Sequence, residues 1–197
     1  AVRLLINNAG IETIGYTWEI PTARWETTLN VNVHGVVHGV RAFVPHMLRV
    51  GQEAWIANLA SIGAFGQMPT QTAYIMSKHA IQSFSECLYL EMQVAKAPIN
   101  VSSINPGMLK TSIFDAEAGK GEPKSAAKHR ATMAHMMASY GMELEVGCKR
   151  IVAKLAAKDF WVDTQPEMTD QSVNGRIAFF QGREAPELND TTRQLLE

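Results

Sequence analysis

Residues 2–10 read VRLLINNAG, an apolar run that ends in a polar turn containing glycine. The run predicts a buried strand, and the Asn-Ala-Gly end predicts a turn, since Asn and Gly tolerate positive φ. The same pattern recurs at AWIA, residues 54–57, and at INVSSI, residues 99–104, each followed by small or polar residues. Residues 160–163 predict a fourth strand.

Helical segments alternate with these strands. They are predicted at 22–49, 72–96, 144–157 and 165–181. Strands that alternate with helices indicate βαβ units and a parallel sheet. The sequence therefore predicts an α/β fold, a partial Rossmann-like doubly wound parallel sheet of about four strands with flanking helices. Residues 1–197 are expected to form a single domain, with 182–197 as a polar tail.

Tyr74 and Lys78 lie four residues apart in AYIMSK, residues 73–78. On a helix, positions i and i+4 share a face, so the ammonium can lie beside the phenol. A nearby cation favours the ionised phenol and can lower its pKa from about 10 by roughly 1–3 units. Such pairs are also frequent on ordinary solvated helix faces, so this pair alone does not decide the function.

Polar residues at the ends of three predicted strands strengthen the catalytic interpretation. Asn8 follows the first strand, Ser61 follows the second, and Pro106-Gly107 follow the third. In an open α/β sheet, ligands bind in the crevice outside the carboxyl ends of the strands. Together with the Tyr74 and Lys78 pair, these residues predict one ligand site at that edge of the sheet.

The combined motifs resemble the short-chain dehydrogenases/reductases in their shorter single-domain branch. These motifs are the Asn-Asn-Ala-Gly turn at 7–10, Ser61, the Tyr-x3-Lys pair and the Pro-Gly-x3-Thr segment at 106–111. Their order and spacing match up to about residue 111, and more loosely to about 165. The resemblance implies an oxidoreductase that uses NAD or NADP and acts on an alcohol or carbonyl. The family's Gly-rich phosphate loop has no counterpart here, so an N-terminally truncated domain is expected.

The resemblance also implies four catalytic residues. Tyr74 is the expected acid/base, Ser61 donates a hydrogen bond to the substrate oxygen, and Lys78 lowers the pKa of the phenol and binds the nicotinamide ribose. Asn32, chosen over Asn30, bends its helix locally and carries a water that links the lysine to solvent. Purely structural roles remain open: Ser61 can cap a turn, and Asn32 can satisfy helix backbone.

Cofactor binding is assigned by the same resemblance. The turn at residues 8–10 can also serve only its own geometry. The expected cofactor-binding residues are Asn8, Ala9, Gly10, Tyr74, Lys78, Pro106, Gly107, Leu109 and Thr111. The residue that selects NAD or NADP is expected upstream of residue 1.

Residues 112–143 are predicted to be an irregular segment that covers the substrate. Four methionines in it suit a flexible apolar lid, which implies an apolar substrate, although they can equally pack a helix. They are Met133, Met136, Met137 and Met142. Lys120, Lys124, Lys128 and Arg130 are predicted to form the solvated outer face of this segment.

The composition favours a cytoplasmic protein with small-molecule partners. A net charge of −1 gives no electrostatic reason to expect nucleic acid or an anionic membrane. No apolar run approaches the ~18–20 residues of a membrane span. Cys87 and Cys148 are expected to be free, buried thiols. His34 and His38 have no acidic third ligand at helical spacing, so no metal site is predicted.

Two functions of different class remain open on the sequence. The first is an active oxidoreductase for a small alcohol or ketone, expected to form a homo-oligomer through helices 22–49 and 72–96. The alternative is a non-catalytic truncated domain that keeps the site residues, cannot bind the dinucleotide, and acts at most through oligomer contacts.

Overall fold

The computed structural model describes residues 1–114, 122–123 and 126–196. Its strands are β1 (Leu4–Asn7), β2 (Ala54–Leu59), β3 (Ile99–Asn105) and β4 (Trp161–Asp163). Its helices are α1 (Thr22–Leu29), a π-helical turn (Asn30–His34), α2 (Gly35–Val50), a 3-10 turn (Ile62–Ala64), α3 (Thr72–Val94), α4 (Ala126–Tyr140), α5 (Leu144–Ala156), α6 (Pro166–Gly182) and α7 (Asp190–Leu196).

The four strands form one parallel sheet in the order β1-β2-β3-β4. In the register, Ile56 of β2 pairs with Leu5 on one side and with Val101 on the other. Ile104 of β3 pairs with Val162 of β4. Because parallel neighbours need a crossover, helices separate the strands in sequence. The predicted fold class, an α/β doubly wound parallel sheet, is confirmed.

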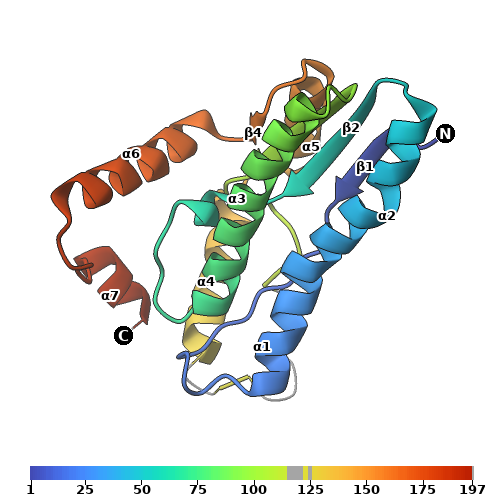
Figure 1. Ribbon diagram of the computed structural model, residues 1–197. Coiled ribbons are helices and arrows are strands. Elements are labelled where there is room, and N and C mark those ends of the chain that lie inside the picture. Colours follow the sequence, from blue (N-terminus) through green and yellow to red (C-terminus); the bar gives the residue numbers. More distant parts are fainter. Residues whose placement is uncertain (115–121, 124–125, 197) are drawn as a thin grey trace.

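Helices cover both faces of the sheet (Figure 1). On one face, Ile56 and Val101 pack against Met47 of α2 and Leu88 of α3. On the other face, Ala57, Ile104 and Val162 pack against Leu155 of α5. Neighbouring residues of a strand point to opposite faces, so β2 contributes to both cores. Full burial of each large aliphatic side chain contributes roughly 1.5–3 kcal/mol.

The predicted helix at 22–49 is not one continuous α-helix. A π-helical turn at Asn30–His34 separates α1 from α2. The buried side chain of Asn32 lies in this turn and holds the loop that follows β1: its Oδ1 accepts from Ile11 N at 2.8 Å. Its Nδ2 donates to Ile11 O at 3.0 Å and to Ser77 Oγ at 3.0 Å. The turn therefore joins α2, α3 and the loop after β1.

Two segments that the sequence analysis left irregular are helical. Residues 126–140 form α4, because this stretch contains neither Gly nor Pro and is rich in Ala and Met, which favour helices. Part of the predicted polar tail forms α7, whose first turn is capped by Asn189 Oδ1 accepting from Thr192 N at 2.8 Å. α6 and α7 extend to one side of the sheet (Figure 1), and α7 contacts α4.

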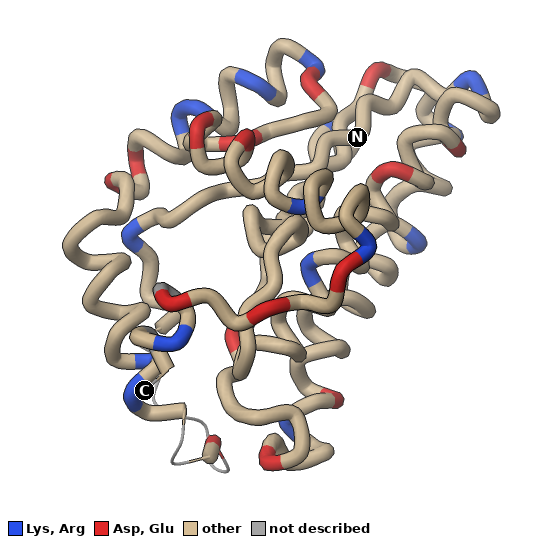
Figure 2. Tube along the Cα trace, turned by 90° about the vertical axis from the view of Figure 1, so that its left-hand side faces the viewer, with Lys and Arg blue, Asp and Glu red and all other residues tan. Residues whose placement is uncertain are grey.

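Positively and negatively charged residues are interspersed along the part of the chain that is described (Figure 2). Arg130 is not the solvated residue that was predicted: its Nε donates to Glu122 Oε2 at 2.9 Å, and both side chains are largely buried. Lys128 is exposed, whereas Lys120 and Lys124 lie outside the described residues. Among the helices that the structure describes, none combines the length and apolar character needed to cross a bilayer.

Candidate active site

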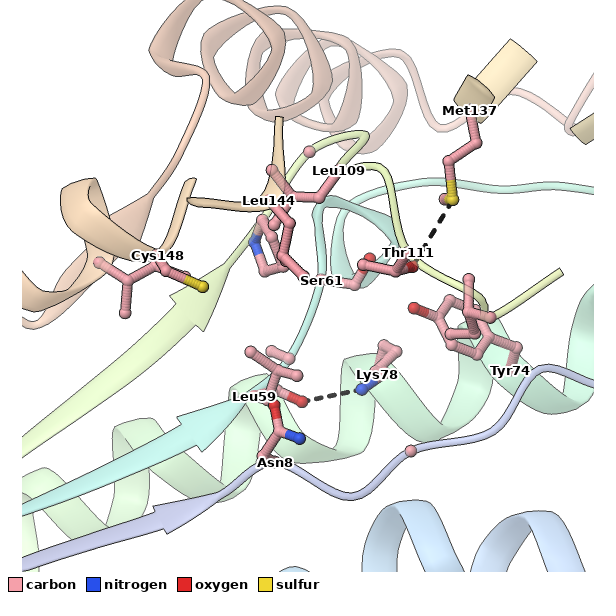
Figure 3. Close-up of a pocket in the computed structure, with 16 residues that line it drawn as sticks. Asn8, Leu59, Ser61, Tyr74, Lys78, Leu109, Thr111, Met137, Leu144 and Cys148 are labelled. Atoms are coloured by element: carbon pink, nitrogen blue, oxygen red, sulfur yellow. Dashed lines mark hydrogen bonds between the residues drawn. The ribbon is translucent and has the colours of Figure 1, made fainter. Parts of the chain in front are cut away.

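A cavity of about 200 Å³ opens at the carboxyl ends of β1, β2 and β3. We call it the first cavity. Ser61 reaches it from the turn after β2, and Tyr74 and Lys78 reach it from α3. Figure 3 shows the three side chains directed into this space, together with Thr111 and Met137. The geometry thus brings one hydroxyl, one phenol and one amine to a single site.

Most of the residues predicted from the sequence line the first cavity. Those that do so are Asn8, Gly10, Ser61, Tyr74, Lys78, Pro106, Gly107, Leu109 and Thr111. Ala9 and Asn32 are not among the lining residues. Ala9 is exposed on the loop, and Asn32 is buried behind it, where it binds Ile11 and Ser77. Asn32 therefore positions the loop in this structure and does not face the cavity.

Helix spacing explains the arrangement of Tyr74 and Lys78. One turn of α3 separates them, and Lys78 Nζ lies 5.5 Å from the centroid of the Tyr74 ring. Lys78 Nζ also donates to Leu59 O at 2.8 Å (Figure 3). This bond fixes the ammonium at the end of β2, so that α3 and the sheet position the amine together.

Ser61 caps a turn and also faces the first cavity. Its Oγ accepts from Gly63 N at 3.0 Å, which anchors the 3-10 turn at Ile62–Ala64. In the same turn, Ile62 N donates to Pro106 O at 3.0 Å and links the segments that follow β2 and β3. The capping bond uses Ser61 as an acceptor, so its hydroxyl proton can be donated elsewhere.

The pKa of Tyr74 is raised above its ordinary value, contrary to the prediction. Burial is the main cause, and the nearby Glu12 carboxyl raises the pKa further. A side-chain hydrogen bond with Ser61 acts in the opposite direction. Burial also lowers the pKa of Lys78 to about 8. Desolvation thus opposes both charged forms at this site, and it leaves the pKa of the phenol above its ordinary value although Lys78 lies nearby.

A second cavity, of about 170 Å³, adjoins the first and shares Ser61, Tyr74, Gly107, Ile113 and Met137 with it. The remaining lining residues are mainly apolar and come from several elements. They are Ile62, Gly63, Ile75, Met108, Phe114, Met133 and Met168, with Glu12 and Gln71 as polar exceptions. Ser61 and Tyr74 therefore lie where the two cavities meet.

Glu12 is the site residue that the sequence analysis missed. Its side chain is buried, and burial raises the pKa of its carboxyl from 4.5 to about 8. Its Oε1 accepts from Thr13 N at 3.2 Å, and its carboxyl forms a side-chain hydrogen bond with Gln71. The only sequence signal was its position, two residues after Gly10, which places it on the loop leading into the site.

Two glycines allow close approach at the first cavity. A Cβ added to Gly107 would lie 2.3 Å from Gln165 Oε1, which is an overlap. A Cβ added to Gly10 would lie 3.4 Å from Lys78 Nζ, in ordinary contact. A side chain at Gly107 would therefore displace the amide of Gln165, whereas a methyl group at Gly10 would make ordinary contact with the Lys78 ammonium.

The predicted burial of the two thiols is wrong. Cys87 and Cys148 are both free, as predicted, but both are exposed. Cys148 lies on α5 at the rim of the first cavity (Figure 3). His34 contacts the side chain of Asn30, with His34 Nδ1 2.8 Å from Asn30 Oδ1. Within the described residues, no group of three or more His, Cys, Asp or Glu side chains is arranged to hold a metal ion.

Residues 1–121 match the sequence profile of the family described as short chain dehydrogenase. SadH of Mycobacterium tuberculosis, which is named as an oxidoreductase, is 35% identical over 122 residues, covering 61% of this chain and 44% of SadH. The NADP-dependent (R)-specific alcohol dehydrogenase of Lentilactobacillus kefiri is 32% identical over 135 residues, covering 68% of this chain and 53% of that enzyme. The chain thus spans about half the length of these relatives.

The similarity extends to three-dimensional structure. The crystal structure of a short chain dehydrogenase/reductase from Burkholderia phymatum, in complex with NAD, matches with a TM-score of 0.87 at 28% identity. The match covers 95% of this chain and 69% of that chain.

Proposed function

This chain belongs to the short-chain dehydrogenase family, and we propose that it forms the catalytic part of an NAD- or NADP-dependent oxidoreductase that interconverts an alcohol and a carbonyl compound. The observation that supports this most directly is the meeting of Ser61, Tyr74 and Lys78 at one cavity. A substrate oxygen placed there can reach a hydroxyl donor and a phenolic proton at once.

In this proposal Tyr74 gives its proton to the carbonyl oxygen during reduction and takes it back during oxidation. Ser61 donates a hydrogen bond to the same oxygen and stabilises its developing negative charge. The raised pKa of Tyr74 keeps the phenol protonated in the unliganded protein, which suits an acid that acts on a carbonyl. Lys78 is near enough to stabilise the phenolate that remains after transfer.

The first cavity fits the nicotinamide end of a dinucleotide. An apolar cavity of about 150 Å³ holds a benzene-sized ring, and the first cavity is slightly larger at about 200 Å³. Leu109, Ile113 and Ile151 offer apolar contacts to such a ring, whereas Asn8 and Lys78 offer polar contacts to an attached ribose. When bound there, the nicotinamide supplies or accepts the hydride.

The second cavity is the proposed place for the rest of the substrate. Met133 and Met137 of α4 line it, and both also pack in a cluster with Ile14 and Phe114. The lid and packing interpretations of these methionines are thus compatible. We propose that the described part of residues 112–143 covers an apolar substrate, with flexible thioether side chains adapting to its shape. Residues 115–121 and 124–125 of this segment lie outside the described residues.

The full-length enzyme tests this proposal. Turnover of ketones with NADH and NADPH should be lost in Tyr74→Phe, because phenylalanine has no proton to give. Tyr89→Phe is the matched control, since Tyr89 lies on the same helix and packs edge-on against Phe160, away from both cavities. Circular dichroism should show the same fold in both variants. Near-parental activity of Tyr74→Phe would refute the assignment.

A separate measurement addresses the non-catalytic alternative. Calorimetric titration of the 197-residue chain with NADH and NADPH would show whether it binds a dinucleotide. We expect weak binding through the first cavity alone, because the pyrophosphate-binding glycine turn of this fold has no counterpart in the sequence. Full-length protein that neither binds a dinucleotide nor turns over a ketone would favour the alternative.

We also propose that subunits pair through α2 and α3. Both helices expose large apolar side chains on the same side of the sheet, where an apolar surface indicates an interaction site. These residues are Phe43 and Leu48 of α2 and Leu90 and Val94 of α3. The helices lie next to each other in front of the sheet (Figure 1).

A further inference from the structure

The second cavity is chemically asymmetric. Ser61 and Tyr74 stand at its junction with the first cavity, and its walls are formed largely by methionine and isoleucine side chains. Glu12 and Gln71 are the polar side chains elsewhere in its lining. A buried charged carboxylate is costly unless it is paired and hydrogen-bonded. The proposed reaction employs neither Glu12 nor Gln71.

The backbone holds Glu12 firmly in the second cavity. Gly15 N donates to Thr70 O at 2.8 Å, which ties the loop after β1 to the residue before Gln71. Thr13 Oγ1 lies 2.7 Å from Thr28 Oγ1 of α1, so the loop is also anchored from the other side. Glu12 is therefore a fixed group, as a residue that selects substrates must be.

The cationic side chains near Glu12 form hydrogen bonds with groups other than its carboxyl. Arg130 of α4 donates to Glu122, and Lys78 of α3 donates to Leu59 O. Arg24 of α1 reaches only the backbone oxygen of Glu12, with its Nη2 at 3.1 Å. Among the described side chains, no ion pair neutralises the Glu12 carboxyl.

Burial favours the protonated form of the Glu12 carboxyl, which can donate a hydrogen bond. Burial raises its pKa to about 8, although the bonds from Gln71 and Thr13 and the charges of Arg130 and Lys78 act in the opposite direction. Burial and the Glu12 carboxyl raise the pKa of the Tyr74 phenol, so the phenol also stays protonated at neutral pH. A protonated carboxyl has one O–H to donate, and the second cavity is the space next to it.

Resting on the proposed function, we infer that Glu12, held by Gln71, selects substrates with a second, uncharged oxygen that accepts a hydrogen bond. The reacting carbonyl or hydroxyl would lie against Ser61 and Tyr74, and a second ether or carbonyl oxygen on a compact apolar frame would accept from Glu12. The second cavity, at about 170 Å³, suits a frame of roughly one six-membered ring.

Three ketones of nearly equal size test this inference in the full-length enzyme: cyclohexanone, tetrahydropyran-4-one and 4-piperidone. Tetrahydropyran-4-one differs from cyclohexanone by one acceptor oxygen opposite the carbonyl. The ratio of kcat/KM for tetrahydropyran-4-one to that for cyclohexanone should be about tenfold higher in the parent than in Glu12→Leu, as one hydrogen bond to a buried group allows. Glu12→Gln should keep most of the preference, because its amide still donates.

The pH dependence separates a donor from a merely structural residue. The ratio should fall in the parent as pH rises through about 8, when the carboxyl loses its proton. It should stay constant in Glu12→Gln, which does not titrate. An unchanged kcat/KM ratio in Glu12→Leu, or a parental ratio that does not depend on pH, would overturn the inference. So would a parental preference for cationic 4-piperidone at about pH 6, which would indicate a carboxylate.

The outcomes distinguish the inference from the function on which it rests. Turnover of all three ketones with no effect of Glu12 variants would refute the inference alone. If no ketone reacts with either nicotinamide, the proposed oxidoreductase fails. In that case, calorimetry measures the dissociation constants of the same three compounds. Equal affinities of the parent and Glu12→Leu for each compound would then also reject the role of Glu12.

Discussion

Replacing Glu12 by Gln should change how the stability of the protein depends on pH. The carboxyl has a pKa of 4.5 when unfolded and about 8 when folded, so the folded state binds the extra proton between these values. Parental stability therefore falls as pH rises from about 4.5 to 8. At ~1.4 kcal/mol per pKa unit, the full loss is on the order of 5 kcal/mol. The Glu12→Gln variant has no titratable group at this position, so it should not show this loss of stability.

Urea unfolding of the parent and Glu12→Gln between about pH 5 and pH 9 measures this difference. The variant should gain stability relative to the parent across that range. Lys78 contributes in the opposite direction at higher pH, because its folded pKa of about 8 lies below its ordinary value of 10.5. The contribution of Lys78 is largely the same in the parent and in Glu12→Gln, so it largely cancels in the difference between their free energies of unfolding.

Glu145→Gln provides the control for this experiment. Glu145 is exposed and pairs with Lys149 one helical turn away, so its replacement should shift stability little at any pH. Parallel curves for the parent and Glu12→Gln would refute the reasoning. They would mean that Glu12 is ionised in the folded protein, and hence that it is not the donor on which the substrate preference depends.

Two further predictions concern the packing of α3. Gln82→Leu should lower the free energy of unfolding in urea by about 1–3 kcal/mol, because leucine would leave buried donors without their acceptor. Gln82 Oε1 accepts from Ser103 Oγ at 2.6 Å and from Asn105 Nδ2 at 3.1 Å. Replacing the exposed Gln93 by Leu should change the stability little, and equal losses in the two variants would contradict this prediction. Leu90→Glu should lower the mass in sedimentation equilibrium by breaking the proposed pairing, and an unchanged mass would exclude Leu90 from the interface.

Local patterns were sufficient to predict the architecture. Each strand was visible as a short apolar run bounded by turn residues, and the spacing of Tyr74 and Lys78 follows from helix geometry alone. The parallel sheet then required the residues after β1, β2 and β3 to share one edge. That is why Asn8, Ser61 and Gly107 could be expected together before their contacts were known.

Tertiary packing decided what the sequence patterns left open. Residues 126–140 lack a strong apolar stripe, so their helix was missed, and α4 supplies Met133 and Met137 to the second cavity. The catalytic role assigned to Asn32 stays a prediction, and the structure adds that its side chain, in the π-helical turn, binds the backbone of Ile11. Such placements depend on which segments approach from elsewhere in the chain.

The sequence by itself determined the sheet, the family and the residue types at its carboxyl edge, because strand and helix periodicities are local properties of the chain. Only the tertiary structure decided the pKa values of the ionisable groups at that edge. It buries Glu12, raises the pKa of Tyr74 and lowers that of Lys78. Desolvation depends on every segment that excludes water from a group, and no short stretch of sequence contains that information.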